Sequence, residues 1–249
     1  MGRHVVLNNI EHKDLKVITR YSAAFGYDVS NVLTFVTEFS AVHKEYPIFF
    51  HADPKTHKLR PVAMLGFDDN ENLFLDEHGA PNGWRARYIP AFSARGPFLI
   101  GFQNQLKDGG DEHTPVIHLD IDDQRLSEHE GEAIFLPLGG NSEYLNAVNH
   151  RLQLILQGLS LNDAMIAAFS ELDLIEPVNL QVQFDNHHEY RIHGYHTVDK
   201  QKLAALASIP LARLNAAGFL EAAHYMISSL ENIPVLVELK NKKCIHSML

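Results

Sequence analysis

The sequence predicts an α+β fold, with a mainly antiparallel β meander in the first half and α-helices packed with a β-hairpin in the second half. Two observations predict it. In about residues 1–140, short apolar runs recur at roughly ten-residue spacing with Gly, Pro and Asn between them. In about residues 141–249, apolar residues recur mostly at helical spacing. Strands and helices are therefore segregated along the chain, whereas a nucleotide-binding βαβ fold alternates them.

The first helix is expected over residues 28–44. Asp28 and Ser30 are both good N-caps. An apolar stripe follows at helical spacing, made of Val32, Phe35, Phe39 and Val42. Pro47 comes next, and the apolar residues 48–50 are expected to form a short buried strand.

The β meander is expected to continue through short apolar runs separated by polar turns. The runs are residues 61–67, 72–76, 88–90, 97–102 and 116–121. Residues 107–112, which contain two glycines and three acidic residues, are expected to form an exposed loop.

The second half begins with a helix whose apolar stripe runs from Tyr144 to Ile155 and stops at Gly158, a plausible C-terminal cap. Ser160 and Asp163 resemble a capping box that opens another helix, to about Leu172. Strict alternation over residues 178–184 predicts a half-buried strand, followed by a second strand over 189–198. Further helices are expected over residues 200–207, 211–217, 219–229 and 233–243.

Composition limits the classes of function. The 249 residues, 45% of them hydrophobic, allow one large domain or two small ones, and we expect a single domain. The formal net charge of −10, from 31 acidic and 21 basic residues, disfavours a nonspecific nucleic-acid binder. The single cysteine, Cys244, excludes internal disulfides and multi-cysteine metal sites.

The N-terminal sequence lacks the apolar stretch of a secretory signal. No window approaches the roughly 20 consecutive apolar residues that a membrane-spanning helix needs. We therefore expect a cytoplasmic protein without a membrane span.

The enzyme-like pattern in the sequence is His-x-Asp, because residues i and i+2 of a strand project to the same face and could hold one metal ion. The pattern occurs at His51–Asp53 and again at His118 and Asp120. Together with a distant histidine, the second pair would form the facial triad of a non-haem Fe(II) oxygenase. The downstream candidates are His188, His193 and His196.

A simpler interpretation of the second pair needs no metal and no cofactor. In it, the Val, Ile and Leu residues of 116–121 pack against one face of a sheet, while His118 and Asp120 point to the other face and meet water. Nucleophile-elbow, Walker A and dinucleotide-binding motifs are absent from the sequence.

The most unusual segment is residues 84–98, which hold three arginines and the only tryptophan of an acidic chain. Arginine and aromatic side chains together make good anchors for peptides, carboxylates or partner proteins. We expect a partly exposed, locally positive binding surface there. Its candidate residues are Trp84, Arg85, Arg87, Tyr88, Arg95 and Phe98.

Several segments share their order and spacing with a bacterial family. They include Pro-Ile-Phe-Phe at 47–50, Glu-Asn-Leu-Phe at 71–74, Trp-Arg-Ala-Arg-Tyr-Ile-Pro-Ala at 84–91, Pro-Phe at 97–98 and Gly-Tyr at 194–195. The chain resembles the SapC family over nearly its whole length, which implies a single SapC-like domain. The family name implies a link to a surface layer. Members often accompany TonB-dependent receptors, halogenase-like flavoproteins and hydroxylase-like proteins. The resemblance carries over no catalytic residue.

The preferred hypothesis is a non-catalytic cytoplasmic binding or accessory protein with a protein or peptide partner. It would serve a peptide-modifying enzyme or TonB-linked nutrient uptake. The first alternative is the Fe(II) oxygenase, with His118, Asp120 and His193 as ligands. The second alternative is a surface-layer component. The sequence leaves the ligand, any catalysis and the oligomeric state open.

Overall fold

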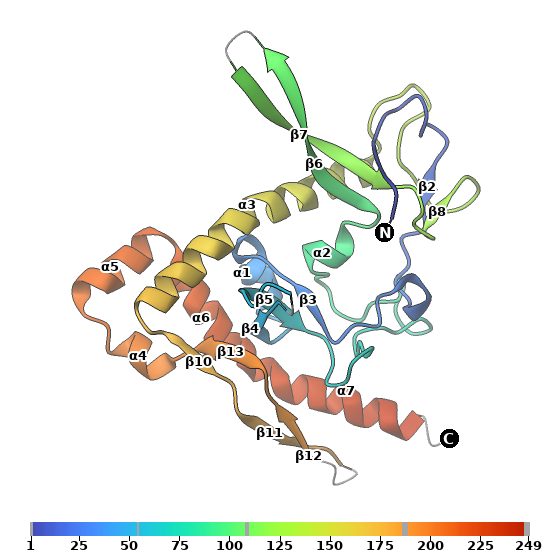
Figure 1. Ribbon diagram of the computed structural model, residues 1–249. Helices are drawn as coiled ribbons and strands as arrows, with labels where there is room; N and C mark the ends of the chain where they lie inside the picture. The colour runs from blue at the N-terminus through green and yellow to red at the C-terminus, as the bar shows by residue number, and fades with distance from the viewer. Residues whose placement is uncertain (1, 54, 108–109, 186–188, 247–249) are drawn as a thin grey trace. The chain divides into compact units, whose positions relative to one another are not determined.

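The computed structural model describes residues 2–53, 55–107, 110–185 and 189–246 (Figure 1). Helices make up 36% of the structure and antiparallel strands make up 24%, which confirms the α+β class. The chain divides into two compact units. One unit contains Met1–Tyr21 and Ala91–Leu156, and the other contains Ser22–Pro90 and Gln157–Leu249. Strands lie mostly in the first half of the chain and helices in the second, as expected. Folding as one domain stays a prediction.

The first unit contains two small antiparallel sheets. One sheet has the order β1-β7-β6, with β1 His4–Val6, β6 Phe98–Lys107 and β7 Gly110–Asp120. The other has the order β8-β2-β9, with β2 Lys16–Val17, β8 Leu126–Ser127 and β9 Glu132–Ala133. The helices are α2, Ala91–Ala94, and the N-terminal part of α3, Glu143–Glu171. The buried core is formed by Val17, Phe98, Leu119, Ile134, Phe135, Leu145, Val148 and Leu152.

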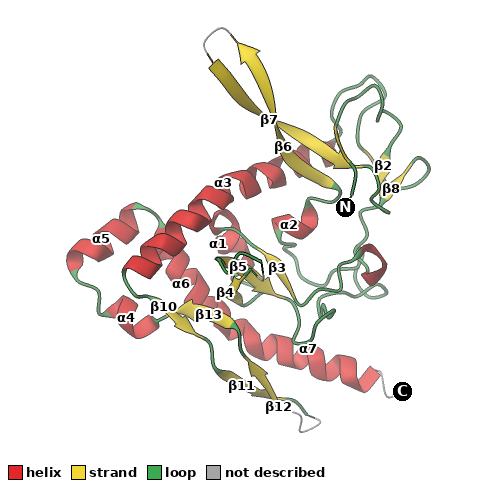
Figure 2. Ribbon diagram, viewed as in Figure 1, coloured by secondary structure: helices red, strands yellow, loops and turns green. Residues whose placement is uncertain are grey.

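The second unit is built on a five-stranded antiparallel sheet with the order β10-β13-β4-β5-β3. The strands are β3 Asn31–Leu33, β4 Ile48–Ala52, β5 Leu59–Met64, β10 Ile175–Pro177 and β13 Tyr195–Val198. A separate hairpin joins β11 Leu180–Gln183 to β12 Glu189–Ile192. Helix α6 packs beside β4 and β13 (Figure 2), and the Ser229 hydroxyl at its end accepts a 2.8 Å hydrogen bond from the backbone N–H of Ile48.

The remaining helices of the second unit are short, apart from the last. The 3-10 helices are η1 Ala23–Phe25, η2 Val36–Glu38 and η3 Leu230–Asn232. The α-helices are α1 Phe39–Val42, α4 Lys200–Ala204, α5 Ser208–Ala216, α6 Phe219–Ser229 and α7 Ile233–His246. The four helices predicted after residue 199 are therefore confirmed, and the bounds of α6 are those predicted.

The helix predicted over residues 28–44 is wrong in its first half. Val32 and Leu33 belong to strand β3 and lie opposite Ala63 and Val62 of β5. Phe35 is also extended, and α-helix forms only at Phe39–Val42. The stripe identified which side chains are buried, but pairing with β5 decided the backbone conformation.

The predicted break at Gly158 is also wrong, because α3 continues through it. A Cβ atom on Gly158 would lie 2.5 Å from the Cβ of Phe35, which packs against the helix at this point. The glycine therefore provides room for Phe35 and does not end the helix. Ser160 lies inside the same helix, and its hydroxyl donates to the carbonyl of Gln157.

Other expected strands are confirmed in part. Residues 48–50, 61–64, 98–102, 116–120 and 180–183 lie in strands. Residues 72–76 and 88–90 do not form strands, apart from an isolated bridge between Leu75 and Trp84. The expected loop at 107–112 is shorter, since β7 already begins at Gly110, and residues 108–109 lie outside the described residues. The strand expected over 189–198 is interrupted at Gly194, which has a φ of 79°.

Candidate binding site

Trp84 is part of the core and not of an exposed binding surface. Its side chain is 3% exposed. The indole N–H donates a 2.8 Å hydrogen bond to the hydroxyl of Tyr46, whose own proton goes to the carbonyl of Tyr88 at 2.6 Å. Tyr27 meets the indole edge-on, at 6.4 Å between ring centroids. The expectation that Trp84 is partly exposed is therefore wrong.

Carboxylates beneath the segment hold its backbone in place. The backbone N–H groups of Arg87 and Tyr88 donate to the Glu45 carboxylate at 2.9 and 3.1 Å. The Tyr88 hydroxyl donates at 2.6 Å to Glu38, a buried carboxylate that is 3% exposed. The side chains of Arg85 and Arg87 are exposed. The two arginines thus project from a segment whose backbone is hydrogen-bonded to Glu45.

Arg95 and Phe98 belong to the first unit, while the other four predicted residues belong to the second. Phe98 is fully buried, so it contributes no binding surface. The Arg95 guanidinium lies over the ring of Phe92 and donates to the carbonyl of Phe98 at 2.5 Å. Binding by the exposed arginines stays a prediction.

Arg85 is the predicted residue that lines a cavity of ligand size. The cavity has a volume of about 540 Å³. Ligand pockets commonly measure about 300–1,000 Å³. Its walls come from the segment around η1, the loop between β5 and Trp84, and helix α7. The lining residues are Ala23, Asp28, Asn70, Asn72, Leu73, Leu75, Asp76, Glu77, His78, Arg85, Leu239, Lys242 and Lys243. We call it the Arg85 cavity.

Most charged groups of the Arg85 cavity are fixed by neighbours. Arg85 pairs with Asp76 at 3.2 Å, and the backbone N–H of Gly79 donates to the same carboxylate at 2.9 Å. Glu77 accepts a 3.2 Å hydrogen bond from the backbone N–H of Ala23. These contacts place a guanidinium at a defined position on the cavity wall.

Helix α7 is attached to the cavity loop by ion pairs around the buried carboxylate of Glu71. Lys243 lies 3.4 Å from this carboxylate, and Lys240 lies 2.8 Å from it and 2.5 Å from Asp68. Burial lowers the pKa of Lys240, but the hydrogen bonds to Asp68 and Glu71 outweigh burial and raise the pKa above its usual value. Lys240 therefore stays charged and keeps α7 against the loop.

The side chains of Asp28 and His78 make no hydrogen bond or ion pair within the described residues. The cavity lining therefore combines an oriented guanidinium, a carboxylate and an imidazole without such partners, and the apolar side chains of Leu73 and Leu239. Such a lining suits a ligand with both hydrogen-bond donors and acceptors, such as a polar peptide. Asp28 and His78 carry no local sequence motif, and only the fold brings them to Arg85.

The His118–Asp120 pair lies on β7 in the first unit, whereas His193 and His196 belong to the second. Leu119, between the pair, is fully buried, and the His118 ring lies against Gly101 of β6. Among the described residues, no group of three or more His, Cys, Asp or Glu side chains could hold a metal ion. His187 and His188 lie outside the described residues.

The side chains of the other His-x-Asp pair, His51 and Asp53, contact different parts of the protein. The ring of His51 packs on Tyr195, at 4.9 Å between centroids. The Asp53 carboxylate accepts backbone hydrogen bonds from Lys55 and Thr56. The two side chains therefore have different partners.

Replacing His118 with alanine is expected to change the free energy of unfolding by less than about 1 kcal/mol and to leave function intact. The ring is only partly buried and covers Gly101, so its loss removes few contacts. Urea unfolding measures the change, with Leu119→Ala as the control that removes a fully buried neighbour. Loss of function by a folded His118→Ala protein would contradict the simple interpretation.

The sequence predicts no apolar segment long enough to span a membrane, but helix α3 is one by length and composition. Its 29 residues include a window with a mean hydropathy of 1.3, so length and composition alone would let it cross a membrane. Core helices of soluble proteins also pass this test, but they are mostly buried, whereas 28% of this window is buried. Leu145 and Leu152 of α3 are buried in the first unit, and Met165 and Phe169 are buried in the second.

Together, the fold and the Arg85 cavity define an α+β protein with a polar cavity of ligand size. The model of the SapC family matches residues 7–236, and the chain belongs to this family. The resemblance in residues 47–50 and 84–91 is thereby confirmed at the family level. No curated protein and no solved structure matches the chain significantly.

Proposed function

We propose that this protein is a non-catalytic binding or accessory protein of the cytoplasm that holds a polar peptide segment in the Arg85 cavity. The observation that carries the proposal is the cavity of about 540 Å³ with Arg85 held at its wall by Asp76. A peptide carboxylate or carbonyl can accept hydrogen bonds from the guanidinium, and peptide N–H or ammonium groups can donate to Asp28.

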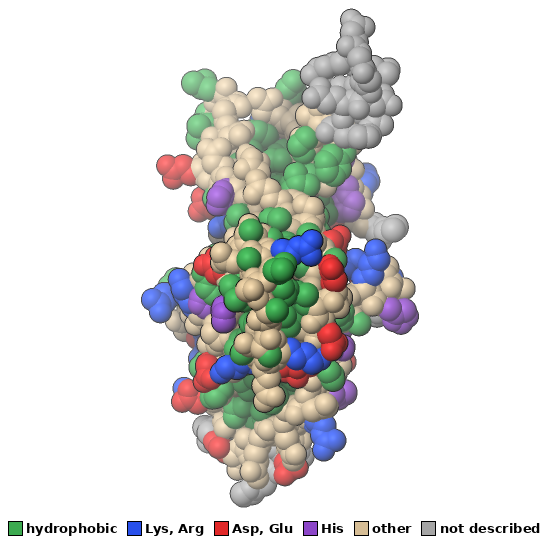
Figure 3. Space-filling view, turned by 90° about the vertical axis from the view of Figure 1, so that its left-hand side faces the viewer, with side chains coloured by type: hydrophobic (Ala, Val, Ile, Leu, Met, Phe, Trp, Pro, Cys, Tyr) green, Lys and Arg blue, Asp and Glu red, His purple; other side chains and the backbone are tan. Residues whose placement is uncertain are grey.

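The distribution of charge supports a peptide over a nucleic acid. The chain has a net charge of −10. On the face shown in Figure 3, basic and acidic side chains are interspersed among hydrophobic ones, and its described part carries no extended basic patch. Nucleic-acid binding draws most of its affinity from basic residues at phosphates. Service to a peptide-modifying enzyme or to TonB-linked uptake is part of the proposal.

The test is a screen of a tetrapeptide library, followed by calorimetric titration of the peptides that bind. Replacing Arg85 with alanine is expected to weaken binding roughly tenfold or more, because a hydrogen bond to a charged group contributes about 1.5–3 kcal/mol. Arg87→Ala is the matched control, since Arg87 is an exposed arginine of the same segment that does not line the cavity. Equal weakening by both substitutions, or no peptide binding at all, would contradict the proposal.

The oxygenase and surface-layer hypotheses are tested by other measurements. Metal analysis of untagged protein tests for stoichiometric iron. Cell fractionation tests the cytoplasmic location, and recovery of most of the protein outside the inner membrane would overturn it.

A further inference from the structure

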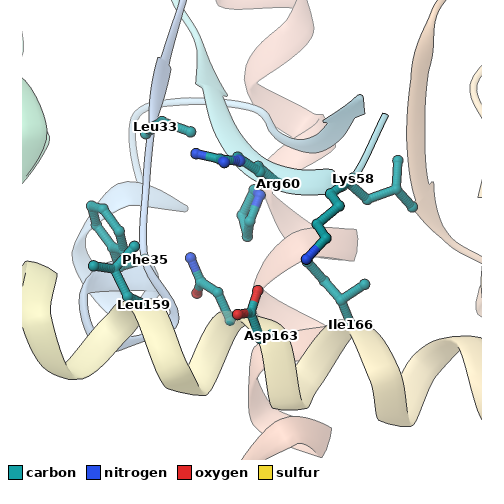
Figure 4. Close-up of a pocket in the computed structure, with 10 residues that line it drawn as sticks. Leu33, Phe35, Lys58, Arg60, Leu159, Asp163 and Ile166 are labelled. Carbon is teal, nitrogen blue, oxygen red and sulfur yellow. The ribbon is translucent and has the colours of Figure 1, made fainter. Parts of the chain in front are cut away.

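A second, smaller cavity lies in the same unit, between the β3–β5 edge of the five-stranded sheet and helix α3 (Figure 4). Its volume is about 160 Å³. An apolar cavity of about 150 Å³ holds a benzene molecule, so this volume suits a ligand of roughly six to eight non-hydrogen atoms. The lining residues are Leu33, Phe35, Lys58, Leu59, Arg60, Pro61, Leu159, Asn162, Asp163 and Ile166. We call it the Lys58 cavity.

The side-chain amide of Asn162, on the wall of the Lys58 cavity, already has hydrogen-bond partners. The amide oxygen of Asn162 accepts from the backbone N–H of Val36 at 2.9 Å, and its NH₂ group donates to the carbonyl of Thr34 at 3.1 Å. This buried amide fixes the end of β3 to α3. Leu33 and Ile166 add apolar surface, so the wall favours a ligand with an apolar part.

Arg60 has a charged neighbour of its own. It pairs with Asp53 at 3.6 Å. The backbone N–H groups of Thr56 and Lys55 donate to the Asp53 carboxylate and hold its pKa below the usual value. Asp53 is therefore ionised and partly neutralises Arg60, which leaves Lys58 as the cation without a fixed counter-charge.

The side chains of Lys58 and Asp163 form no hydrogen bond or ion pair in the described part of the chain. Figure 4 shows Lys58 extending from the start of β5 toward α3, where Asp163 stands across the cavity. One unmatched positive charge and one unmatched negative charge therefore face the same small space, on two different elements.

We propose that the Lys58 cavity binds a small α-amino acid with an apolar side chain. Lys58 binds its carboxylate, Asp163 binds its ammonium group, and the apolar side chain packs between Leu33 and Ile166. The two opposite charges select a zwitterion over a simple anion or cation, and the volume excludes large side chains. This site is separate from the Arg85 cavity and does not depend on the proposed function.

The test uses L-valine as the probe in calorimetric titration. Isovalerate, which lacks the amino group, and L-valinamide, which lacks the carboxylate, are its singly charged analogues of similar size. L-valine is expected to bind with a dissociation constant of about 1 mM or lower, which corresponds to about 4 kcal/mol. Each analogue lacks one charge-assisted contact and is expected to bind roughly tenfold more weakly.

The matched substitutions assign each charge to its partner. Lys58→Gln is expected to weaken L-valine roughly tenfold and to abolish its advantage over L-valinamide. Asp163→Asn is expected to abolish its advantage over isovalerate. Lys55→Gln, at an exposed lysine of the same turn outside the cavity, and Arg85→Ala are expected to leave L-valine binding unchanged.

Thermal melting confirms that each variant is folded, which is expected because Lys58 and Asp163 are exposed. The proposal is overturned if L-valine does not bind at about 10 mM. It is also overturned if isovalerate binds the unmodified protein as tightly as L-valine does, since the ammonium group would then have no partner. Loss of peptide binding in Arg85→Ala with L-valine binding retained would separate the two sites.

Discussion

Replacing Trp84 with alanine is expected to lower the free energy of unfolding of the second unit by about 3–5 kcal/mol. The side chain is 3% exposed and fills space beside Tyr27 and Tyr46. Its removal leaves a cavity and takes the indole donor from the Tyr46 hydroxyl, so apolar contacts and a buried hydrogen bond are lost together.

Urea unfolding followed by circular dichroism measures this loss, because Trp84 is the only tryptophan and its fluorescence disappears with it. Trp84→Phe keeps most of the apolar volume and is expected to cost about 1–3 kcal/mol, chiefly for the missing donor. Arg87→Ala, at an exposed neighbour, is expected to stay within about 0.5 kcal/mol of the unmodified protein. A loss below about 1 kcal/mol for Trp84→Ala would show that Trp84 is not a core residue.

Replacing Gly158 with alanine is expected to lower the free energy of unfolding by about 1–3 kcal/mol. Helix propensity alone predicts the opposite sign, since alanine stabilises a helix interior by about 0.8–1.0 kcal/mol relative to glycine. The added Cβ would lie 2.5 Å from the Cβ of Phe35 and 2.9 Å from two of its ring carbons. Because Phe35 is 2% exposed, it has little room to move, and the overlap outweighs propensity.

The sign of the change in urea unfolding decides between packing and propensity. Ser160→Ala, at an exposed position two residues later in α3, is the control and is expected to be neutral or slightly stabilising. In a Phe35→Ala background the penalty of Gly158→Ala is expected to shrink by about 0.5 kcal/mol or more, because the two ring contacts are gone. A stabilising Gly158→Ala in the unmodified protein would restore the interpretation of Gly158 as a helix end.

Elements whose stability is mainly local followed from the sequence. Helix α6 has its predicted bounds, Phe219–Ser229, because Gly218 precedes it in the left-handed conformation and apolar residues recur at helical spacing within it. The β11–β12 hairpin was predicted from strict alternation for the same reason, since the pattern lies within the paired strands themselves.

Elements that depend on distant partners did not follow from local patterns. Val32 and Leu33 fit a helical stripe and a buried strand equally well, and pairing with β5, some thirty residues away, selected the strand. Gly158 has the local signature of a helix end, but the position of Phe35 gives it another role.

For the candidate sites too, some features followed from the sequence and others only from the tertiary structure. The sequence by itself determined that residues 84–91 are distinctive, that the chain is acidic and that it resembles the SapC family. Only the tertiary structure decided that Trp84 is buried while Arg85 lines a cavity with Asp28, and that Lys58 faces Asp163. Composition and spacing report which chemical groups a chain carries. Their convergence depends on sheet order and helix packing, which bring residues about a hundred positions apart, such as Lys58 and Asp163, to one cavity.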